Sequence, residues 1–268
     1  MRMLDVAIVT MGRQGMERLA ASRLPEVAGV GYVVSWQPAG AEPIVPPALL
    51  ERPDVEVVIT DTVGASINRN NALDHCSAQL ILMADDDLEF SAEGLRGVIG
   101  AFEAHEDIDF AVFAYSGADH PRYPIAEVPL PPVPSGFPVA TFTIAVRRSV
   151  TGRGVRFDER FGPGSRLPLG EDEMLFHTLL RRGFKGRFFP MVIVRHAGLT
   201  SGYRPVDAPS ACALGAIIGM VYPLSSLLRI PLKAWRMGRS GQMPTLPALA
   251  ALTHGWLTQL IMTRPWHN

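Results

Sequence analysis

The sequence predicts an α/β fold with a mostly parallel central sheet flanked by helices, followed by a C-terminal helical extension. Apolar strand-like segments alternate with segments of helical periodicity from Asp5 to Ser116. These strands are apolar without interruption, as in parallel sheets that helices cover on both faces. The 268-residue chain is 47% hydrophobic and 19% charged. That composition supplies a full core and excludes a disordered chain.

The first half shows the alternation most clearly and predicts a Rossmann-like arrangement of a parallel sheet covered by helices. Strands are expected over five segments: Asp5–Met11, Gly29–Trp36, Val55–Asp61, Ala78–Asp85 and Asp109–Ser116. Three segments between them have helical spacing: Met16–Leu24, Ser66–Ser77 and Ser91–His105. In the second of these, Ile67, Leu73 and Cys76 are expected on one apolar face.

The second half begins with a break in the pattern. Residues Gly117–Pro138 contain seven prolines and predict an irregular linker or binding loop. Strand character returns at Val139–Val150 and Arg187–His196, and between them a helix is expected over Glu171–Gly183. The segments up to residue 204 therefore form one predicted domain, 1–204.

Residues 205–268 form the predicted extension. Two of its segments, Ala208–Leu228 and Gln242–Met262, carry no charge and are long enough to span a bilayer. Between them lie four basic residues, Arg229, Lys233, Arg236 and Arg239. Helices lying on a membrane face are the preferred interpretation. A two-span hairpin, packing on the protein itself and packing against a second subunit in a homo-oligomer remain alternatives.

Charge and cysteine content narrow the setting. The formal net charge of −1 gives no argument for nucleic acid as a partner. From Arg195 onward, however, the chain has seven basic residues and one acidic residue. This excess of positive charge indicates either that the tail binds an anionic surface, such as a membrane face, or that it forms a basic helical cap on the protein. Cys76 and Cys212 fit neither the spacing of a disulfide framework nor that of a metal site. The first residues of the sequence are predicted to enter a strand rather than to form a signal peptide. We expect a cytoplasmic protein, peripheral to the inner face of the cell membrane.

The segment "LILMADDDLEFS" ends an apolar strand on Asp85, Asp86 and Asp87. Three adjacent carboxylates repel one another unless water screens them or a cation binds. They fall at the carboxyl edge of the predicted sheet, where ligands of open α/β folds bind. Either a hard divalent cation or a solvated acidic turn accounts for them.

A second acidic group, Glu171, Asp172 and Glu173, begins the helix predicted in the second half. First-turn carboxylates gain about 0.3–1 kcal/mol each from the helix dipole, so this pattern has an ordinary structural explanation. Group transfer to a hydroxyl, however, requires one carboxylate set for a metal and another for proton abstraction.

"GASINRNNALDHCSAQLILMADDD" has a small-residue turn, an Arg-Asn pair and a strand ending in a D-x-D motif. "FDERFGPGSRLPLGEDEMLFHTLLRRGFKGRFFPMVIVRH" has F-D-E-x-F-G, G-E-D, an R-x-G turn and a terminal histidine. In this order, the two segments resemble the nucleotide-binding half and the second half of the family-2-type inverting glycosyltransferases of the GT-A fold. The resemblance extends from Asp5 to His196.

The resemblance implies a set of donor-binding residues. Thr10 would lie at the nucleotide, and Arg69 would approach its base and diphosphate. Asp85 would approach the ribose, with Asp86 beside it in the same donor site. Asp87 would hold Mn²⁺ or Mg²⁺, and His196 would be a further metal or diphosphate ligand unless it is structural.

The resemblance also implies the chemistry. Asp172, with Glu171 beside it, would take a proton from the acceptor hydroxyl as that oxygen attacks the anomeric carbon and inverts it. One departure concerns the nucleobase, because family members usually end the second strand with an acidic residue. Here Gln37 could pair with a uracil edge and Trp36 could stack on it.

The expected function is therefore a metal-dependent, inverting transfer of a sugar, in the hexosyltransferase class. The donor would be a nucleotide-diphosphate sugar, with UDP-sugars favoured, and the acceptor a hydroxyl of a saccharide or lipid-linked molecule in cell-surface polysaccharide or glycolipid biosynthesis. No Q-x-x-R-W motif is present, which favours a single addition over polymerisation. The alternatives are a nucleotidyltransferase of the same superfamily and a non-catalytic saccharide-binding or assembly protein.

Overall fold

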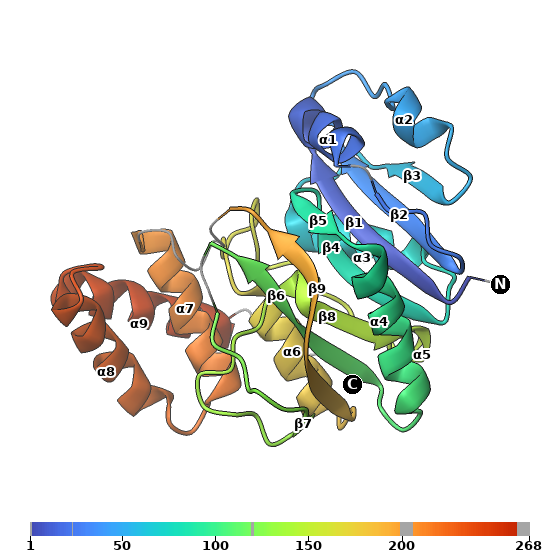
Figure 1. Ribbon diagram of the computed structural model, residues 1–268. Helices are drawn as coiled ribbons and strands as arrows, with labels where there is room; N and C mark the ends of the chain where they lie inside the picture. Colours follow the sequence, from blue (N-terminus) through green and yellow to red (C-terminus); the bar gives the residue numbers. More distant parts are fainter. Residues whose placement is uncertain (1, 23, 119–120, 199–205, 262–268) are drawn as a thin grey trace.

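A computed structural model describes residues 2–22, 24–118, 121–198 and 206–261, and it confirms the α/β class (Figure 1). One nine-stranded mixed sheet forms the centre, and a group of three helices projects from one side. The strands are β1 (Leu4–Met11), β2 (Val30–Gln37), β3 (Val55–Ile59), β4 (Leu80–Asp85), β5 (Leu88–Phe90), β6 (Phe110–Gly117), β7 (Val128–Leu130), β8 (Ile144–Arg147) and β9 (Gly186–His196).

The sheet has the order β3-β2-β1-β4-β8-β6-β9-β5, with β7 also paired to β9. The first four strands are mutually parallel, as predicted, and β6 is parallel to β9. Strand β8 lies antiparallel between β4 and β6, and the short strands β5 and β7 are both antiparallel to β9. The carboxyl ends of β1, β2 and β4 therefore share one edge.

Helices cover both faces of the sheet. On one face, α1 (Gly12–Ala21) and α4 (Ala92–Ala104) pack over alternate residues of β1 such as Val6 and Ile8. On the other face, α3 (Ala65–His75), α5 (Arg148–Gly152) and α6 (Glu171–Arg181) pack over Ala7 and its neighbours. The short helix α2 (Pro47–Leu50) precedes β3. This two-sided burial explains why the strands are continuously apolar.

Three predicted boundaries were wrong. The helix predicted over Met16–Leu24 begins earlier, at Gly12. The positive φ of 67° at Gly12 turns the chain directly from β1 into α1, so no separate turn lies between them. In the predicted strand Val139–Val150, only Ile144–Arg147 is extended, between a 3-10 helix (Thr141–Thr143) and α5. The proline-rich loop contains β7, which pairs at a sheet edge where proline is tolerated.

The C-terminal extension consists of α7 (Ala208–Val221), α8 (Ser226–Arg239) and α9 (Thr245–Ile261). Helix α7 packs on the loop before α6 through Ala213 and Ile217, against Phe161 and Leu167. Helices α7 and α9 cross closely, because a Cβ atom at Gly215 would lie 1.9 Å from the Leu252 carbonyl oxygen. Packing on the protein itself thus accounts for part of the uncharged sequence.

Within the described ranges, none of the helices combines the length and the hydropathy needed to cross a membrane. The predicted domain boundary between residues 204 and 205 and the predicted end at Met262 lie outside the described residues.

Candidate functional site

The candidate site lies at the carboxyl edge of the parallel half of the sheet. Thr10 is near the end of β1, Gln37 ends β2 and Asp85 ends β4. The parallel register pairs Val9 with Asp85 and Met11 with Gln37, so the three strands end at nearly the same level. Parallel pairing alone therefore brings together side chains that lie far apart in the sequence.

The three consecutive aspartates do not share one environment. Strand β5, which begins directly after them, pairs with β9 at the far side of the sheet, so the turn is pulled across the edge. Asp85 stays over β4 and accepts a hydrogen bond from Arg69 at 2.8 Å. Asp87 lies beside His196 at the end of β9, with 3.3 Å between its Oδ2 atom and the imidazole Nε2 atom. The three carboxylates therefore diverge and contact separate partners, which relieves the mutual repulsion expected from the sequence.

Asp86 turns inward, toward α1. Its carboxylate accepts hydrogen bonds from the Thr10 hydroxyl at 2.5 Å and from the Arg18 guanidinium at 2.7 Å. Burial raises the pKa of Asp86, although both hydrogen bonds act in the opposite direction. Gly15 is required here, because a Cβ atom would lie 2.3 Å from the Thr10 Oγ1 atom. Thr10 and Asp86 were predicted to bind the donor, and in this structure their polar groups bind each other.

Arg69 joins the two acidic groups of the sequence. It lies buried on α3, and its two terminal nitrogens bind Asp85 at 2.8 Å and Glu171 at 3.1 Å. Burial opposes its charge, but the two carboxylates more than compensate and raise its pKa. The ring of Phe157 lies 5.5 Å from the guanidinium carbon. The structure therefore brings the D-x-D and G-E-D segments to one site, as the resemblance implied.

Glu171 and Asp172 have distinct environments at the start of α6. The Glu171 carboxylate is paired with Arg69, whereas Asp172 accepts a hydrogen bond from the backbone N–H of Glu173 at 2.8 Å. Burial, followed by the charges of Glu171 and Glu173, raises the pKa of Asp172 to about 7. The position of Asp172 at a helix N-terminus favours its ionised form, but burial and the neighbouring charges outweigh that effect. A pKa near the working pH suits a general base.

Polar side chains on the buried face of α3 hold the site together. The Asn68 amide donates to the Thr10 carbonyl at 3.1 Å, and Ser66 donates to the Phe161 carbonyl at 2.7 Å. Ile67, predicted to lie on an apolar face, is only half-buried. Sequence periodicity missed this helix face because its contacts are hydrogen bonds, and the run of asparagines was the only signal.

We predict that Asn70→Ala lowers the free energy of unfolding by about 2–4 kcal/mol, because it leaves two buried backbone groups without partners. The Asn70 side chain donates to the Phe157 carbonyl at 3.0 Å and accepts from the Phe157 N–H at 2.8 Å. Chemical denaturation measures the change. Asn71→Ala is the matched control, because it removes a single bond to Ser35 from the same helix. Equal effects from the two substitutions would contradict the prediction.

Beside Gln37 lies a groove of about 410 Å³ at the carboxyl ends of β2 and β3. The Gln37 amide nitrogen donates to the Thr62 hydroxyl at 3.1 Å and so ties β2 to the groove wall. Trp36 was expected to offer a stacking face, but it is buried in the core and donates to the Gly12 carbonyl. The groove also holds a carboxylate, Asp61, which sequence reasoning passed over because it follows the third strand and not the second.

The pair Asp87 and His196 fits a divalent cation. A carboxylate oxygen and an imidazole nitrogen face each other, and the buried His196 Nδ1 atom has no hydrogen-bond partner within the described part of the chain. Across that same part, no group of three or more His, Cys, Asp or Glu side chains is arranged to hold a metal. A cation here would complete its coordination with substrate oxygens and water, as Mg²⁺ and Mn²⁺ commonly do.

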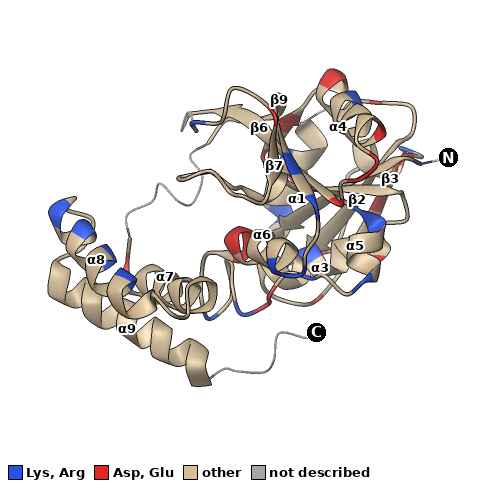
Figure 2. Ribbon diagram, turned by 90° about the horizontal axis from the view of Figure 1, so that it is seen from below, with Lys and Arg blue, Asp and Glu red and all other residues tan. Residues whose placement is uncertain are grey.

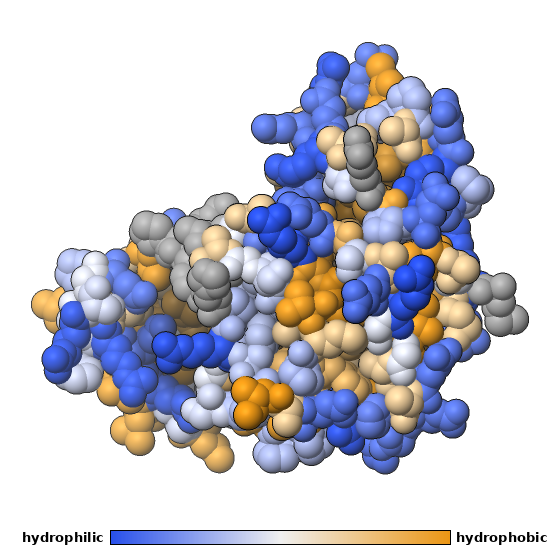
Figure 3. Space-filling view, in the orientation of Figure 1, coloured by the Kyte–Doolittle hydropathy of each residue, from blue (hydrophilic) through white to orange (hydrophobic). Residues whose placement is uncertain are grey.

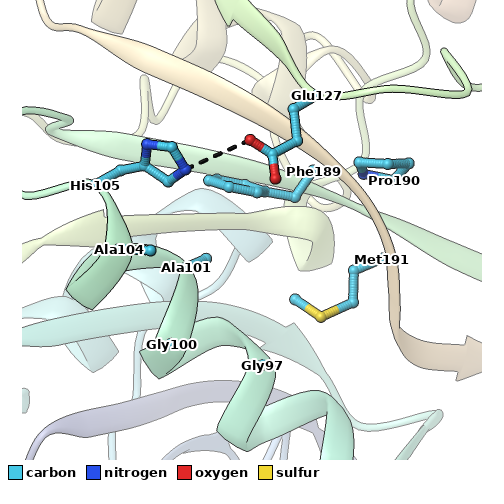
Figure 4. Close-up of a pocket in the computed structure, with 9 residues that line it drawn as sticks. All are labelled: Gly97, Gly100, Ala101, Ala104, His105, Glu127, Phe189, Pro190 and Met191. Carbon is cyan, nitrogen blue, oxygen red and sulfur yellow. Dashed lines mark ion pairs between the residues drawn. The ribbon is translucent and has the colours of Figure 1, made fainter.

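A second groove, of about 450 Å³, lies between α4 and β9 on the opposite flank of the sheet (Figure 4). One end is closed by an ion pair between His105 and Glu127 at 3.4 Å. Its lining is mainly small and apolar: Gly97, Gly100, Ala101, Ala104, His105, Glu127, Phe189, Pro190 and Met191. None of the predicted site residues lines it, so we assign it no part in the site.

Comparison with known proteins bears on the fold. Residues 40–154 match the family model described as glycosyl transferase family 2. No curated protein matches the chain. The structure of S. aureus TarS 1-349 is 14% identical, with a TM-score of 0.58 over 97% of this chain and 92% of that one. The same protein in complex with UDP gives a TM-score of 0.57 over 90% and 72%.

A similar likeness extends to the mannosyltransferase PcManGT from Pyrobaculum calidifontis, solved in complex with GDP-Man and Mn2+. It is 14% identical, with a TM-score of 0.57 over 97% of this chain and 88% of that one. At this identity the structural likeness concerns the fold, and it confirms the predicted GT-A type architecture.

Proposed function

We propose that this chain, which carries a family 2 glycosyl transferase segment at residues 40–154 on a GT-A fold, transfers a sugar from a nucleotide-diphosphate donor to an acceptor hydroxyl with inversion. The observation that carries the proposal is the contact network of Arg69. This one side chain binds both Asp85, on the donor side, and Glu171, on the side of the candidate base. Donor and base are thereby held in fixed relation, which transfer between two bound substrates requires.

In the proposed reaction, Asp172 takes the proton of the acceptor hydroxyl while the oxygen attacks the anomeric carbon. The bond from that carbon to the donor diphosphate breaks on the opposite face, and the nucleoside diphosphate leaves with the electron pair. Glu171 cannot compete for the proton as easily, because Arg69 binds its carboxylate. Burial, together with the neighbouring charge of Glu171, raises the pKa of Asp172 to about 7, so its carboxylate is a stronger base than an ordinary aspartate and is still partly ionised at neutral pH.

Asp87 and His196 would hold Mn²⁺ or Mg²⁺, which supplies positive charge to the departing diphosphate. The complex of PcManGT with GDP-Man and Mn2+ supports a divalent cation in this fold. Asp85 would approach the donor ribose, and Arg69, which pairs with it, would balance the added negative charge of the donor. Thr10 and Asp86 shape the floor of this site through their mutual hydrogen bond.

The nucleobase would lie in the groove next to Gln37. UDP and GDP-Man are bound by proteins of this fold, and both uracil and guanine present ring N–H donors. The Asp61 carboxylate on the groove wall can accept such a donor. Asp61 would thereby take the place of the acidic residue with which family members usually end the second strand.

A donor screen tests the proposed function. The purified chain is incubated with UDP-, GDP-, ADP- and dTDP-sugars, with and without Mn²⁺, and release of nucleoside diphosphate is measured. The expected result is cation-dependent release from one base class. Release of pyrophosphate from a nucleoside triphosphate and a sugar phosphate would instead identify a nucleotidyltransferase. Binding of saccharides without any release would identify a non-catalytic protein.

We predict that Asp61→Asn weakens donor binding about tenfold, since a hydrogen bond to a charged group contributes about 1.5–3 kcal/mol and this one is at an open rim. Titration calorimetry with the preferred donor and with donors of other bases measures the affinities. The ratio between the affinity for the preferred donor and the affinities for the others should decrease. Glu51→Gln, an exposed acidic residue at the end of α2 and before β3, is the matched control. Unchanged affinity for every donor would exclude Asp61 from the base site.

A further inference from the structure

We propose that the outer face of α8 docks on an anionic lipid bilayer. We define this α8 face by four exposed apolar residues of the helix and one in the turn just before it: Leu227, Leu228, Leu232 and Trp235, with Leu224. Leu224 is 98% exposed and Leu228 is 78% exposed. Figure 3 shows hydrophobic residues along the outer edge of the helical extension, next to strongly hydrophilic ones.

Helix α8 has one apolar stripe more than packing requires. Its core stripe contains Ile230, Ala234 and Met237, which are buried against α7 and α9. On the other side of the helix, Leu228 and Trp235 recur at helical spacing and face solvent. A surface helix of a globular protein normally has a single apolar stripe, so the second one needs a partner.

Basic residues form the third stripe of α8. Arg229, Lys233, Arg236 and Arg239 follow one another along the helix, which Figure 2 shows in blue. From Ala208 to Asn268 the sequence contains no Asp or Glu. Among the described residues, none of the four basic side chains has a carboxylate within 4.0 Å. An apolar stripe bordered by unpaired cations is the pattern of a helix lying in the interface of an anionic membrane.

Aromatic rings reinforce this assignment. The Arg229 guanidinium lies 3.8 Å from the centre of the Tyr222 ring, and that of Arg239 lies 5.1 Å from the Trp235 ring. Tyr222 and Trp235 are both exposed. Aromatic rings beside cations are typical of residues at the headgroup level of a bilayer.

A bilayer explains the charge better than a second copy of the chain does. In a two-fold symmetric dimer, the same patch contacts itself, so the basic stripe would meet an identical basic stripe. Like charges placed opposite each other at an interface cost several kcal/mol. Anionic headgroups, in contrast, neutralise the stripe while the apolar residues leave water.

Vesicle sedimentation tests the docking with the full chain. The vesicles are phosphatidylcholine alone, or phosphatidylcholine mixed with phosphatidylglycerol. We expect binding to the mixed vesicles and a blue shift of tryptophan fluorescence that Trp235→Phe abolishes. The double variant Arg229→Gln/Arg236→Gln should lower partitioning about fivefold per charge, the fold-change that corresponds to about 1 kcal/mol. Its matched control is Arg96→Gln, an exposed arginine on α4.

The apolar stripe is tested separately. Leu228→Ser/Trp235→Ser should abolish binding to the mixed vesicles, whereas Ile125→Ser, a fully exposed apolar residue elsewhere, should not. Equal binding to neutral and mixed vesicles, or no binding, would overturn the proposal. So would a concentration-dependent dimer that the double serine variant dissociates. Donor affinity should be unchanged in all these variants, so failure of docking leaves the proposed function standing.

Discussion

Asp172→Asn should lower the turnover number about 10²–10⁴-fold, the usual consequence of losing a general base. The substitution keeps the size of the side chain and removes its ability to accept a proton. Donor affinity should stay within a few-fold of the wild-type value, because the groups placed toward the donor are Asp85, Arg69 and Asp87. Single-turnover rates and donor titration separate the two quantities.

Two controls come from the same helix turn. Glu173→Gln should have a much smaller effect on turnover, since Glu173 is exposed and Arg69 pairs with Asp85 and Glu171 instead. Glu171→Gln removes one of the two carboxylate partners of Arg69 and a charge that raises the pKa of Asp172. The dependence of the turnover rate of this variant on pH should therefore shift to lower pH. Near-normal turnover of Asp172→Asn would transfer the role of the base to Glu171.

The pH dependence of stability provides a readout that does not use substrate. The pKa of Asp172 is about 7 in the folded state, above the ordinary pKa of an aspartate in an unfolded chain. At pH values between these two, the folded state therefore binds a proton that the unfolded state does not. Stability from this group is therefore present at low pH and decreases as the pH rises through about 7. Asp172→Asn should be more stable than wild type above neutral pH and similar to it at acidic pH. Thermal unfolding across this range measures the difference.

Asp87→Asn should weaken cation-dependent donor binding about 10²–10³-fold, because a bound divalent cation contributes several kcal/mol of charge stabilisation. Asp87 is exposed at the turn and contacts His196, so its replacement leaves the core untouched. Without added cation, the mutant and wild type should bind the donor equally weakly. Glu89→Gln is the matched control, because Glu89 lies two residues away and pairs with the exposed Arg195. Unchanged cation affinity in Asp87→Asn would remove the metal site.

Much of the fold follows from hydrophobic pattern, because the strands are buried on both faces and read as apolar runs. Strand β7 escaped prediction since its three residues include Pro129 and it pairs only at an edge. Helix α3 shows a different limit. Its inner face is built from Ser66, Asn68 and Asn70, whose contacts are specific hydrogen bonds that no periodicity reveals.

Sequence motifs located both acidic groups but could not separate the aspartates by role. That Asp86 turns toward Arg18, while Asp87 meets His196, depends on the pairing of β5 with β9. Likewise, the raised pKa of Asp172 depends on burial that only the packed chain shows. Residues that are adjacent in the sequence therefore acquire different chemical roles through their tertiary contacts.

The pairing of β5 with β9 also determines when the site becomes complete during synthesis. Strand β5 follows the acidic turn directly, but its partner ends at His196, more than 100 residues later, as the 106-residue separation of Glu89 and Arg195 records. A nascent chain that has released only β1–β6 has the acidic turn without the strand that draws Asp87 toward β9. Closing so long a loop is slow compared with local helix formation. The turn can therefore reach its native arrangement, with Asp87 beside His196, only after nearly the whole sheet has been synthesised.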